Sequence, residues 1–536
     1  MLKHSLTLLA LTTALLSPAN AGPDALIKAQ DLHQQLSSRP NPQQLLLLDA
    51  SPTPRFRAGH IPGAVSADFW RYGMNPGSAG QWQARMRGWG IRQDPAQRIV
   101  IYDAGADNLA TRVYFDLLTH GIPAKRMQVL DGGLHQWQAQ GGLLQQGEGQ
   151  APEPGDMTAQ PADPRWLAQL PEFVSLSGEP QRGRLVEALD PQNYFGAQQW
   201  FDRAGHVPNA LMLPHTELFN ADRTFRAPEE LSRRLQHLGL RADQPAISYC
   251  GGGVAGSVPF FAMQALLDWP QAKLYVGSQR EYLLDERRLP LWQYAQRSPL
   301  RDRAWLAGWN NRLMRQFGAT HLTVLDLREA EAFQKERLPG AIHLPASLWQ
   351  QHRNEPARLA DLLAQAGARP DRELVLVGAH SGLSPDKALA LVLLHDLGHA
   401  QASALDESVD DWALAGGDME KGAPNARTAP TPAPRWQAPA RSLRTAQIPS
   451  PSAGAHRQWL GPTPTAQRPG AALRASSLLQ ANGQPQPAWQ LWETLRKVGV
   501  DRYAELLVDL PDSGEAAQLL WLLQLAGMPK VQVVQR

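Results

Sequence analysis

The amino-acid sequence predicts an α/β protein, built as a tandem array of small domains that each hold a small parallel sheet flanked by helices on both faces. One observation is a phrase that recurs as RAGHIPGAV (57–65), RAGHVPNAL (203–211), ERLPGAIHLPAS (336–347) and RPGAALRASS (468–477). Another is a short β-branched run that follows each phrase and ends in a loop. A segment with helical apolar spacing then follows each loop. Strands that alternate with helices pair in parallel through right-handed crossovers.

The spacing within the four copies is steady. The second residue of each P-G-A-like turn precedes the same loop position by 39 to 41 residues, in the pairs Gly63 and Asp103, Asn209 and Cys250, Gly340 and Ala379, and Gly470 and Pro511. We therefore expect four repeated domains, the last one degenerate, at residues 22–150, 165–295, 303–420 and 437–536.

Linkers between these domains are indicated by composition. Residues 145–164 and 416–436 are rich in proline and glycine, and a shorter joint lies near 296–304. Proline-rich joints are extended and semi-rigid, which suits domains that pack side by side.

The first residues read MLKHSLTLLALTTALLSPANA, in which Lys3 and His4 precede an apolar run that ends at Leu16, and Ala19 and Ala21 flank Asn20. This pattern is typical of a signal peptide cleaved after residue 21. Its apolar run is shorter than the ~20 residues that span a bilayer. We expect an exported protein, periplasmic in a bacterium, that has no membrane attachment after cleavage.

The charge balance disfavours two classes of partner. The net charge is +2, from 52 basic and 50 acidic residues. Such a chain has no sustained field to attract nucleic acid or anionic lipid. We therefore expect neither as a partner.

The stretch AISYCGGGVAGSVPFF (246–261) holds the only cysteine of the chain, Cys250. A lone cysteine in an oxidising compartment is either a buried small hydrophobe or is kept for its chemistry. Here a strand ends at the thiol, and three glycines permit a curl in which backbone N–H groups converge on the sulfur. A helix that opens near Ser257, with Pro259 in its first turn, adds positive potential. This environment favours the nucleophilic thiolate.

Phosphate chemistry is a weaker interpretation of the same loop. The segment lacks the G-K-[ST] ending of a P-loop, and Gly251, Gly253 and Gly256 fit the G-x-G-x-x-G pattern only loosely. Phosphatases with related loops need an arginine six residues after the cysteine to hold the phosphoryl oxygens. Gly256 stands at that position, so phosphate hydrolysis ranks below sulfur transfer.

The recurring phrase, the cysteine loop about 40 residues later and the segment VLDGGLHQW (129–137) resemble the rhodanese superfamily of sulfurtransferases. The whole-chain plan is similar to that of exported sulfurtransferases with several such domains. The resemblance places the nucleophile at Cys250 in the second domain. Asp103, Ala379 and Pro511 stand there in the other three, which are therefore expected to be inactive.

The resemblance implies a two-step reaction that needs no metal or organic cofactor. Cys250 would take a sulfane sulfur from a small anion such as thiosulfate or 3-mercaptopyruvate, hold it as a persulfide, and pass it to cyanide or a thiol. The loop that binds the substrate and persulfide would consist of Gly251, Gly252, Gly253, Val254 and Ala255. Thiosulfate enzymes resemble Cys-Arg-Lys-Gly-Val-Thr and mercaptopyruvate enzymes Cys-Gly-Ser-Gly-Val-Thr, so the donor stays open.

Four charged or polar residues near the motifs call for separate interpretations. Arg203 lies just before AGHVPNA, and Arg280 is expected on the loop after the strand that follows the cysteine loop. Both are candidates for binding an anionic donor, although a solvated surface arginine is an equally weighted interpretation of each. His206 recurs as His60 beside an inactive loop, which indicates a structural hydrogen bond in both copies. Asp103 is interpreted as a hydrogen-bonded anchor of its loop.

A competing function is an exported sulfur carrier or binding scaffold with little turnover. A fold does not fix a function, and three copies of the repeat lack the thiol. Three glycines behind the only thiol favour the enzyme, because a scaffold does not need them.

Overall fold

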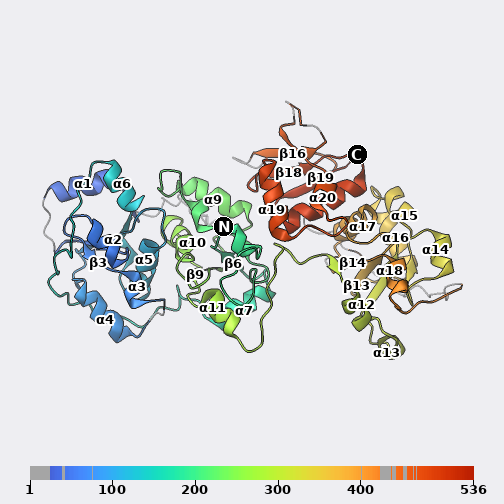
Figure 1. Ribbon diagram of the computed structural model, residues 1–536, viewed down its shortest axis with the longest axis horizontal. Helices are drawn as coiled ribbons and strands as arrows, with labels where there is room; N and C mark the ends of the chain where they lie inside the picture. Colours follow the sequence, from blue (N-terminus) through green and yellow to red (C-terminus); the bar gives the residue numbers. More distant parts are fainter. Residues whose placement is uncertain are drawn as a thin grey trace, which may run out of the picture. The chain divides into compact units, whose positions relative to one another are not determined.

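A computed structural model of the chain (Figure 1) describes residues 25–38, 43–74, 77–399, 401–422, 436, 442–448, 450, 456–462, 464–465 and 468–535. The expected signal peptide at 1–21 and much of the expected linker at 416–436 lie outside these residues. The chain divides into two compact units. The first contains Met1–Leu170, His215–Ser232 and Ala242–Ser278, and the second contains Pro171–Pro214, Arg233–Arg241 and Gln279–Arg536.

The first repeat forms a five-stranded parallel sheet with the order β1-β5-β4-β2-β3. Its strands are β1 (Leu26–Ile27), β2 (Leu45–Asp49), β3 (Val65–Ser66), β4 (Arg98–Tyr102) and β5 (Met127–Leu130). Its helices are α1 (Ala29–Ser37), α2 (Thr53–Ala58), α3 (Phe69–Tyr72), α4 (Ala79–Gly88), α5 (Leu109–Thr119), the 3₁₀ turn η1 (Ala124–Arg126) and α6 (Gly133–Ala139).

The second repeat contributes segments to both units. Its strands β6 (Arg184–Glu187) and β7 (Leu211–Met212) pair in parallel, and so do β8 (Ala246–Tyr249) and β9 (Ala272–Leu274). Its helical segments are α7 (Leu170–Gly178), α8 (Pro191–Tyr194), η2 (His215–Leu218), α9 (Pro228–His237), α10 (Ser257–Phe261), the π-helical turn η3 (Ala262–Leu266) and α11 (Ser278–Leu284).

The third and fourth repeats have the same strand order as the first, β10-β14-β13-β11-β12 and β15-β19-β18-β16-β17. The third contains β10 (Leu300–Arg301), α12 (Arg303–Trp309), α13 (Arg312–Gln316), β11 (Leu322–Asp326), α14 (Ala330–Lys335), β12 (Ile342–His343), α15 (Ala346–Gln351), α16 (Pro356–Gln365), β13 (Glu373–Val377), α17 (Pro385–Asp396), β14 (Ala402–Leu405) and α18 (Val409–Leu414). The fourth contains β15 (Arg444–Thr445), β16 (Arg457–Gly461), β17 (Gly470–Ala472), η4 (Ala475–Leu478), α19 (Ala488–Lys497), β18 (Glu505–Val508), α20 (Ser513–Leu525) and β19 (Val531–Val534).

The predicted α/β class, with small parallel sheets between helices, is confirmed. The sequences of the central strands explain it, because β4 and β13 are nearly continuous apolar runs, as strands buried on both faces require. The domain boundaries stay a prediction, since the strands and helices do not fix where each domain ends.

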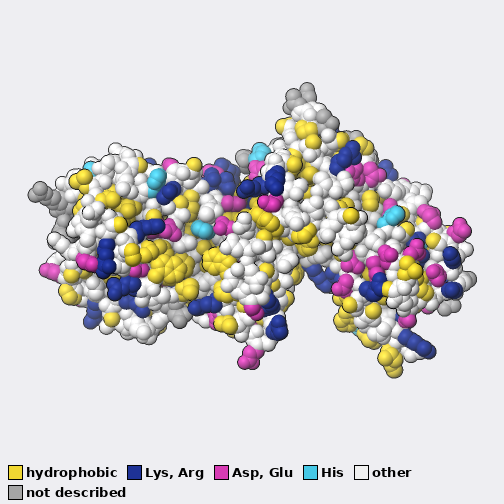
Figure 2. All heavy atoms as spheres, in the orientation of Figure 1, with side chains coloured by type: hydrophobic (Ala, Val, Ile, Leu, Met, Phe, Trp, Pro, Cys, Tyr) yellow, Lys and Arg dark blue, Asp and Glu magenta, His cyan; other side chains and the backbone are white. Residues whose placement is uncertain are grey.

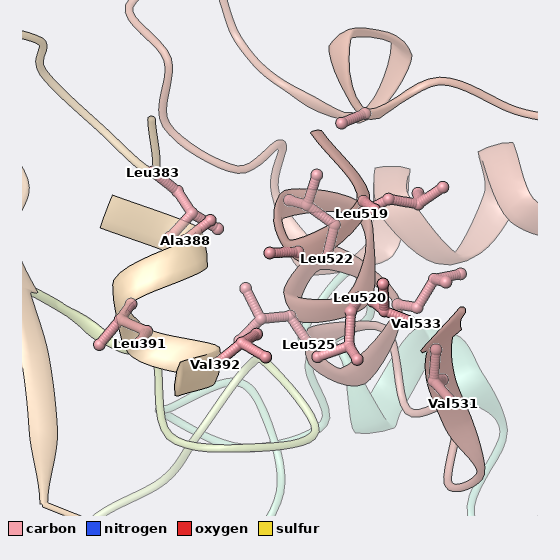
Figure 3. Close-up of a cluster of buried hydrophobic side chains, with 14 of the residues drawn as sticks. Leu383, Ala388, Leu391, Val392, Leu519, Leu520, Leu522, Leu525, Val531 and Val533 are labelled. Carbon is pink, nitrogen blue, oxygen red and sulfur yellow. The ribbon is translucent and has the colours of Figure 1, made fainter. Parts of the chain in front are cut away.

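The helix after the strand-end loop is largely buried in the first, third and fourth repeats. Every residue of α5 is buried, and α17 and α20 bury most of theirs. In the second unit α17 packs against α20 (Figure 3), where leucine and valine side chains such as Leu391, Val392, Leu522 and Leu525 form one apolar cluster. This pairing joins the third repeat to the fourth.

The surface agrees with the balanced composition. Basic and acidic side chains are interspersed over the face that Figure 2 shows. Among the residues that the structure describes, no helix is both long and apolar enough to cross a bilayer.

The α17–α20 cluster gives a direct test of packing. Leu522 is fully buried, whereas Leu414 on α18 is 86% exposed. We expect Leu522→Ala to lower the free energy of unfolding by about 2–5 kcal/mol, because it leaves a cavity. Leu414→Ala should change it by less than about 0.5 kcal/mol. Urea unfolding followed by far-UV circular dichroism measures both, and equal effects would contradict the described core.

Candidate functional site

Cys250 directly follows β8 and is 3% exposed. Its backbone N–H donates to Ser278 Oγ at 3.1 Å, and the N–H of Gly253 donates to its Sγ at 3.0 Å. Ser278 in turn donates its hydroxyl proton to the carbonyl of Tyr275 at 2.8 Å. The Cys250 backbone is therefore fixed at the end of β8 by Ser278, and its sulfur accepts a hydrogen bond from the loop that follows.

Added side chains at two of the three glycines would meet a neighbour: backbone at Gly253, and only the end of a flexible side chain at Gly252. Gly253 has a φ of +80°, and a Cβ there would lie 2.5 Å from the carbonyl oxygen of Val276. A Cβ on Gly252 would lie 2.6 Å from Sδ of Met74. The N–H of Gly253 reaches the sulfur, whereas convergence of further loop N–H groups on it stays a prediction.

The second half of the loop, which leads into α10, is buried. Val254 and Ala255 are 9% and 6% exposed. The hydroxyl of Ser257 donates to the carbonyl of Val254 at 2.7 Å and lies 2.8 Å from Thr111 Oγ1, on α5. The helix begins at Ser257 and contains Pro259, as the sequence predicts.

The structure adds Arg112, which sequence reasoning missed, to the surroundings of the loop. This arginine of α5 is fully buried. Its Nε donates to both carboxylate oxygens of Asp116 at 3.1 Å, its Nη1 to the carbonyl of Gly253 at 3.1 Å and its Nη2 to the carbonyl of Met74 at 3.2 Å. The sequence feature that could have indicated this role is the arginine itself, a charged residue within the largely apolar helical segment NLATRVYFDLLTHG.

The buried Arg112–Asp116 pair is an electrostatic feature of the site. Burial raises the pKa of Asp116, and the neighbouring charge of Arg112 opposes this rise. Tyr72 also donates its hydroxyl proton to Asp116 at 3.0 Å. The guanidinium donates to the carbonyl of Gly253 and therefore holds the backbone of the residue whose N–H reaches the sulfur.

Asp103 takes the nucleophile position in the first repeat and anchors its loop, as predicted. Its two carboxylate oxygens accept hydrogen bonds from the N–H groups of Gly105 at 2.8 Å and Ala110 at 2.9 Å. Burial, reinforced by the charge of Asp107, raises the pKa of Asp103 to about 6.

The two histidines of the recurring phrase make equivalent structural contacts. His60 Nδ1 lies 2.9 Å from the carbonyl oxygen of Phe56, and His206 Nδ1 lies 2.7 Å from that of Tyr194. Each imidazole also stacks on the ring of the same partner. Burial lowers the pKa of His206 to about 3, so this ring is neutral near pH 7. The predicted structural role of both histidines is confirmed.

Arg203 and Arg280 belong to the second unit, whereas Cys250 belongs to the first. The Nη1 of Arg203 donates to the carbonyl of Leu289 at 2.7 Å. Arg280 lies in the first turn of α11, so its assignment to a loop was wrong, because the helix already begins at Ser278. Anion binding by these arginines stays a prediction.

The third and fourth repeats lack a sulfur at the matching position. In the third, the ammonium group of Lys387 closes the loop by donating to the carbonyls of His380 and Leu405, both at 2.7 Å. Burial lowers the pKa of Lys387 to about 8. In the fourth, Asp512 caps α20 by accepting from the N–H of Glu515 at 2.7 Å.

The steric requirement at Gly253 can be tested with a matched glycine. Gly239 also has a positive φ, of +86°, but a Cβ there would meet no atom within 4 Å. We expect Gly253→Ala to lower the free energy of unfolding by about 1–3 kcal/mol more than Gly239→Ala, since only the former overpacks its surroundings. Urea unfolding of both variants provides the comparison, and equal losses would mean that the loop can relax around a methyl group.

Comparisons with known proteins identify the family of the chain. The rhodanese-like domain family matches residues 29–140 and 309–415. A probable 3-mercaptopyruvate sulfurtransferase of Pseudomonas aeruginosa is 32% identical over 278 residues, which are 48% of this chain and 95% of that relative. A sulfur carrier protein of Thermus thermophilus is 27% identical over 242 residues, which are 42% of this chain and 83% of that protein. The crystal structure of a 3-mercaptopyruvate sulfotransferase from Escherichia coli gives a TM-score of 0.42 at 26% identity and covers 48% of this chain and 98% of that one. The chain belongs to the rhodanese superfamily of sulfurtransferases.

Proposed function

We propose that this protein transfers a sulfane sulfur through a persulfide on Cys250, from a small anionic donor to a thiophilic acceptor. The observation that carries the proposal is the 3.0 Å hydrogen bond from the Gly253 N–H to Cys250 Sγ, in a loop that is contacted by a buried guanidinium. A backbone donor aimed at sulfur stabilises negative charge there, and the thiolate is the attacking species.

In the first step the thiolate of Cys250 attacks the transferable sulfur of the donor. With 3-mercaptopyruvate, the S–S bond forms as the carbon–sulfur bond breaks, and the pyruvate enolate leaves and takes a proton. With thiosulfate, the sulfur–sulfur bond of the donor breaks and sulfite leaves. Either donor leaves one additional sulfur on Cys250.

The second step restores the enzyme. An acceptor such as cyanide attacks the outer sulfur of the persulfide, thiocyanate leaves, and Cys250 returns as a thiolate. The loop amide that donates to Sγ remains in place in both steps, because Gly253 is held by its own carbonyl contact with Arg112. A preorganised donor of this kind needs no rearrangement as charge moves.

3-Mercaptopyruvate is the donor that we favour. The loop Cys-Gly-Gly-Gly-Val-Ala is closer to the mercaptopyruvate pattern than to the thiosulfate pattern, and the Pseudomonas aeruginosa relative is named for the former. The serine of that pattern is a glycine at position 252 here. A serine Cβ there would lie 2.6 Å from Sδ of Met74, so the Met74 side chain would have to shift to admit it.

The second candidate is a sulfur carrier that accepts sulfur but releases it only to a specific protein. The enclosed position of Cys250 and the name of the Thermus thermophilus relative support it. The two candidates differ in turnover with small acceptors, since a carrier loads once and then stops.

The proposal predicts multiple turnovers of thiocyanate formation when donor and cyanide are supplied together. We expect 3-mercaptopyruvate to give the higher kcat/KM, and Cys250→Ser to abolish the reaction. Colorimetric thiocyanate detection measures both. At most one thiocyanate per protein would support the carrier instead, and unchanged activity in Cys250→Ser would refute both candidates.

Arg112 should act as a positioning residue. We expect Arg112→Gln to lower kcat for thiocyanate formation by ~10²-fold, because a loop displaced by about 1 Å costs that much. Arg112→Lys should have a kcat nearly as low, since an ammonium group cannot make the several directed hydrogen bonds of the planar guanidinium. Arg57, which is exposed and paired with Glu148, supplies the control Arg57→Gln.

Thermal melting of each Arg112 variant separates misfolding from misplacement of the loop. A folded Arg112→Gln protein that retains the wild-type kcat would show that the guanidinium does not position the loop for the reaction.

A further inference from the structure

The second unit contains a cavity of about 630 Å³ that the proposed reaction does not use. This volume lies within the range of ligand pockets in proteins. Its walls come from the start of β6, from β7, from residues 292–301 and from the C-terminal end of α20. None of the lining residues belongs to the Cys250 loop.

The charges that line the cavity are unbalanced. Four arginines, Arg184, Arg297, Arg301 and Arg502, face one carboxylate, Glu373. Glu373 is already engaged, because its Oε1 accepts from Arg301 Nε at 3.3 Å and from Ser403 Oγ at 3.0 Å. The cavity therefore carries an excess of positive charge.

Two of the four guanidinium groups already have partners in the protein. Arg301 bonds to Glu373 and donates to the carbonyl of Ser298 at 3.0 Å. Arg502 donates to the carbonyl of Met212, and its guanidinium lies 5.1 Å from the ring centroid of Tyr503. These contacts fix one side of the cavity as a rigid cationic wall.

The guanidinium groups of Arg184 and Arg297 have no hydrogen bond or ion pair among the residues that the structure describes. The Nε of Arg184 is buried without a partner, and burial lowers the pKa of this arginine. Burial and the nearby charge of Arg297 together lower the pKa of Arg301. Arg184 as a whole is half-buried and Arg297 is exposed, so the unpaired buried group is the Nε of Arg184. A buried N–H without an acceptor is costly, and a ligand in the cavity could supply that acceptor.

We propose that this cavity binds a small multivalent anion whose charge lies on carboxylate groups or on a tetrahedral oxyanion. The guanidinium fork matches both groups, since each offers two acceptor oxygens in one plane. Tyr194, Trp292 and Trp521 line the same cavity, so there is also an apolar surface for the carbon skeleton of an organic anion. The site is separate from the sulfur chemistry and requires no turnover at Cys250.

The test is isothermal titration calorimetry of the full chain in low-salt buffer, with citrate in one arm and sulfate in the other. We expect saturable binding of at least one probe at one site per chain. Arg184→Gln should raise the dissociation constant about tenfold or more, which is the expected loss of one charge-assisted pair. Tighter binding of citrate would identify a carboxylate ligand, and tighter binding of sulfate an oxyanion.

Arg182→Gln is the matched control. This arginine stands two positions from Arg184, is exposed, pairs with Glu179 at 3.0 Å and does not line the cavity. We expect its variant to bind the probe as the wild type does. Arg297→Gln removes the second partnerless guanidinium at an exposed position, so it tests the site even when Arg184→Gln fails to fold.

Three results would overturn the proposal. One is the absence of saturable binding with both probes, and another is equal weakening by Arg182→Gln and Arg184→Gln. The third is a Cys250→Ala variant that no longer binds the probe anion while Arg184→Gln and Arg297→Gln bind it as the wild type does. This result would place the anion at the cysteine loop.

Discussion

The fully buried guanidinium of Arg112 connects three segments that are distant in the sequence. It bonds to Asp116 on its own helix, to the carbonyl of Met74 and to the carbonyl of Gly253 in the cysteine loop. A buried arginine is tolerated only when its donors are satisfied, so the three segments must come together for the first unit to be stable. The loop that holds Cys250 is thus contacted by a helix from the first repeat.

The first repeat has Asp103 in place of a thiol, yet its helix α5 contacts the cysteine loop. Asp103 accepts a hydrogen bond from its own loop and so fixes the loop conformation. Helix α5 packs on α10 through edge contacts of Tyr114 with Phe261 and of Phe115 with Phe260, at ring separations of 4.9 and 5.0 Å. The third and fourth repeats form the corresponding helix pair from aliphatic side chains. The pairing of repeats is preserved where no thiol remains, which indicates that it supports the architecture as well as the chemistry.

The local features of the site could be predicted from the sequence because they depend on near neighbours. Strand 246–249, the thiol at its end, the glycine curl and the helix start at Ser257 all follow from patterns within sixteen residues. Arg112 and Ser278 could not be predicted in this way. Their contacts with the loop join residues 141 and 28 positions apart, and no spacing rule specifies which side chains meet after folding. The arginine-lined cavity was missed for the same reason, because its walls combine segments from three repeats.

Intact-mass spectrometry of the purified protein, after incubation with 3-mercaptopyruvate and no acceptor, tests the central claim most directly. Cys250 is the only cysteine, so any added sulfur that cyanide removes must come from one position. The account predicts a gain of one sulfur atom per chain, reversed by cyanide and absent in Cys250→Ser. A protein that remains at its starting mass with either 3-mercaptopyruvate or thiosulfate, while its thiol is shown to be reduced, would contradict the persulfide account.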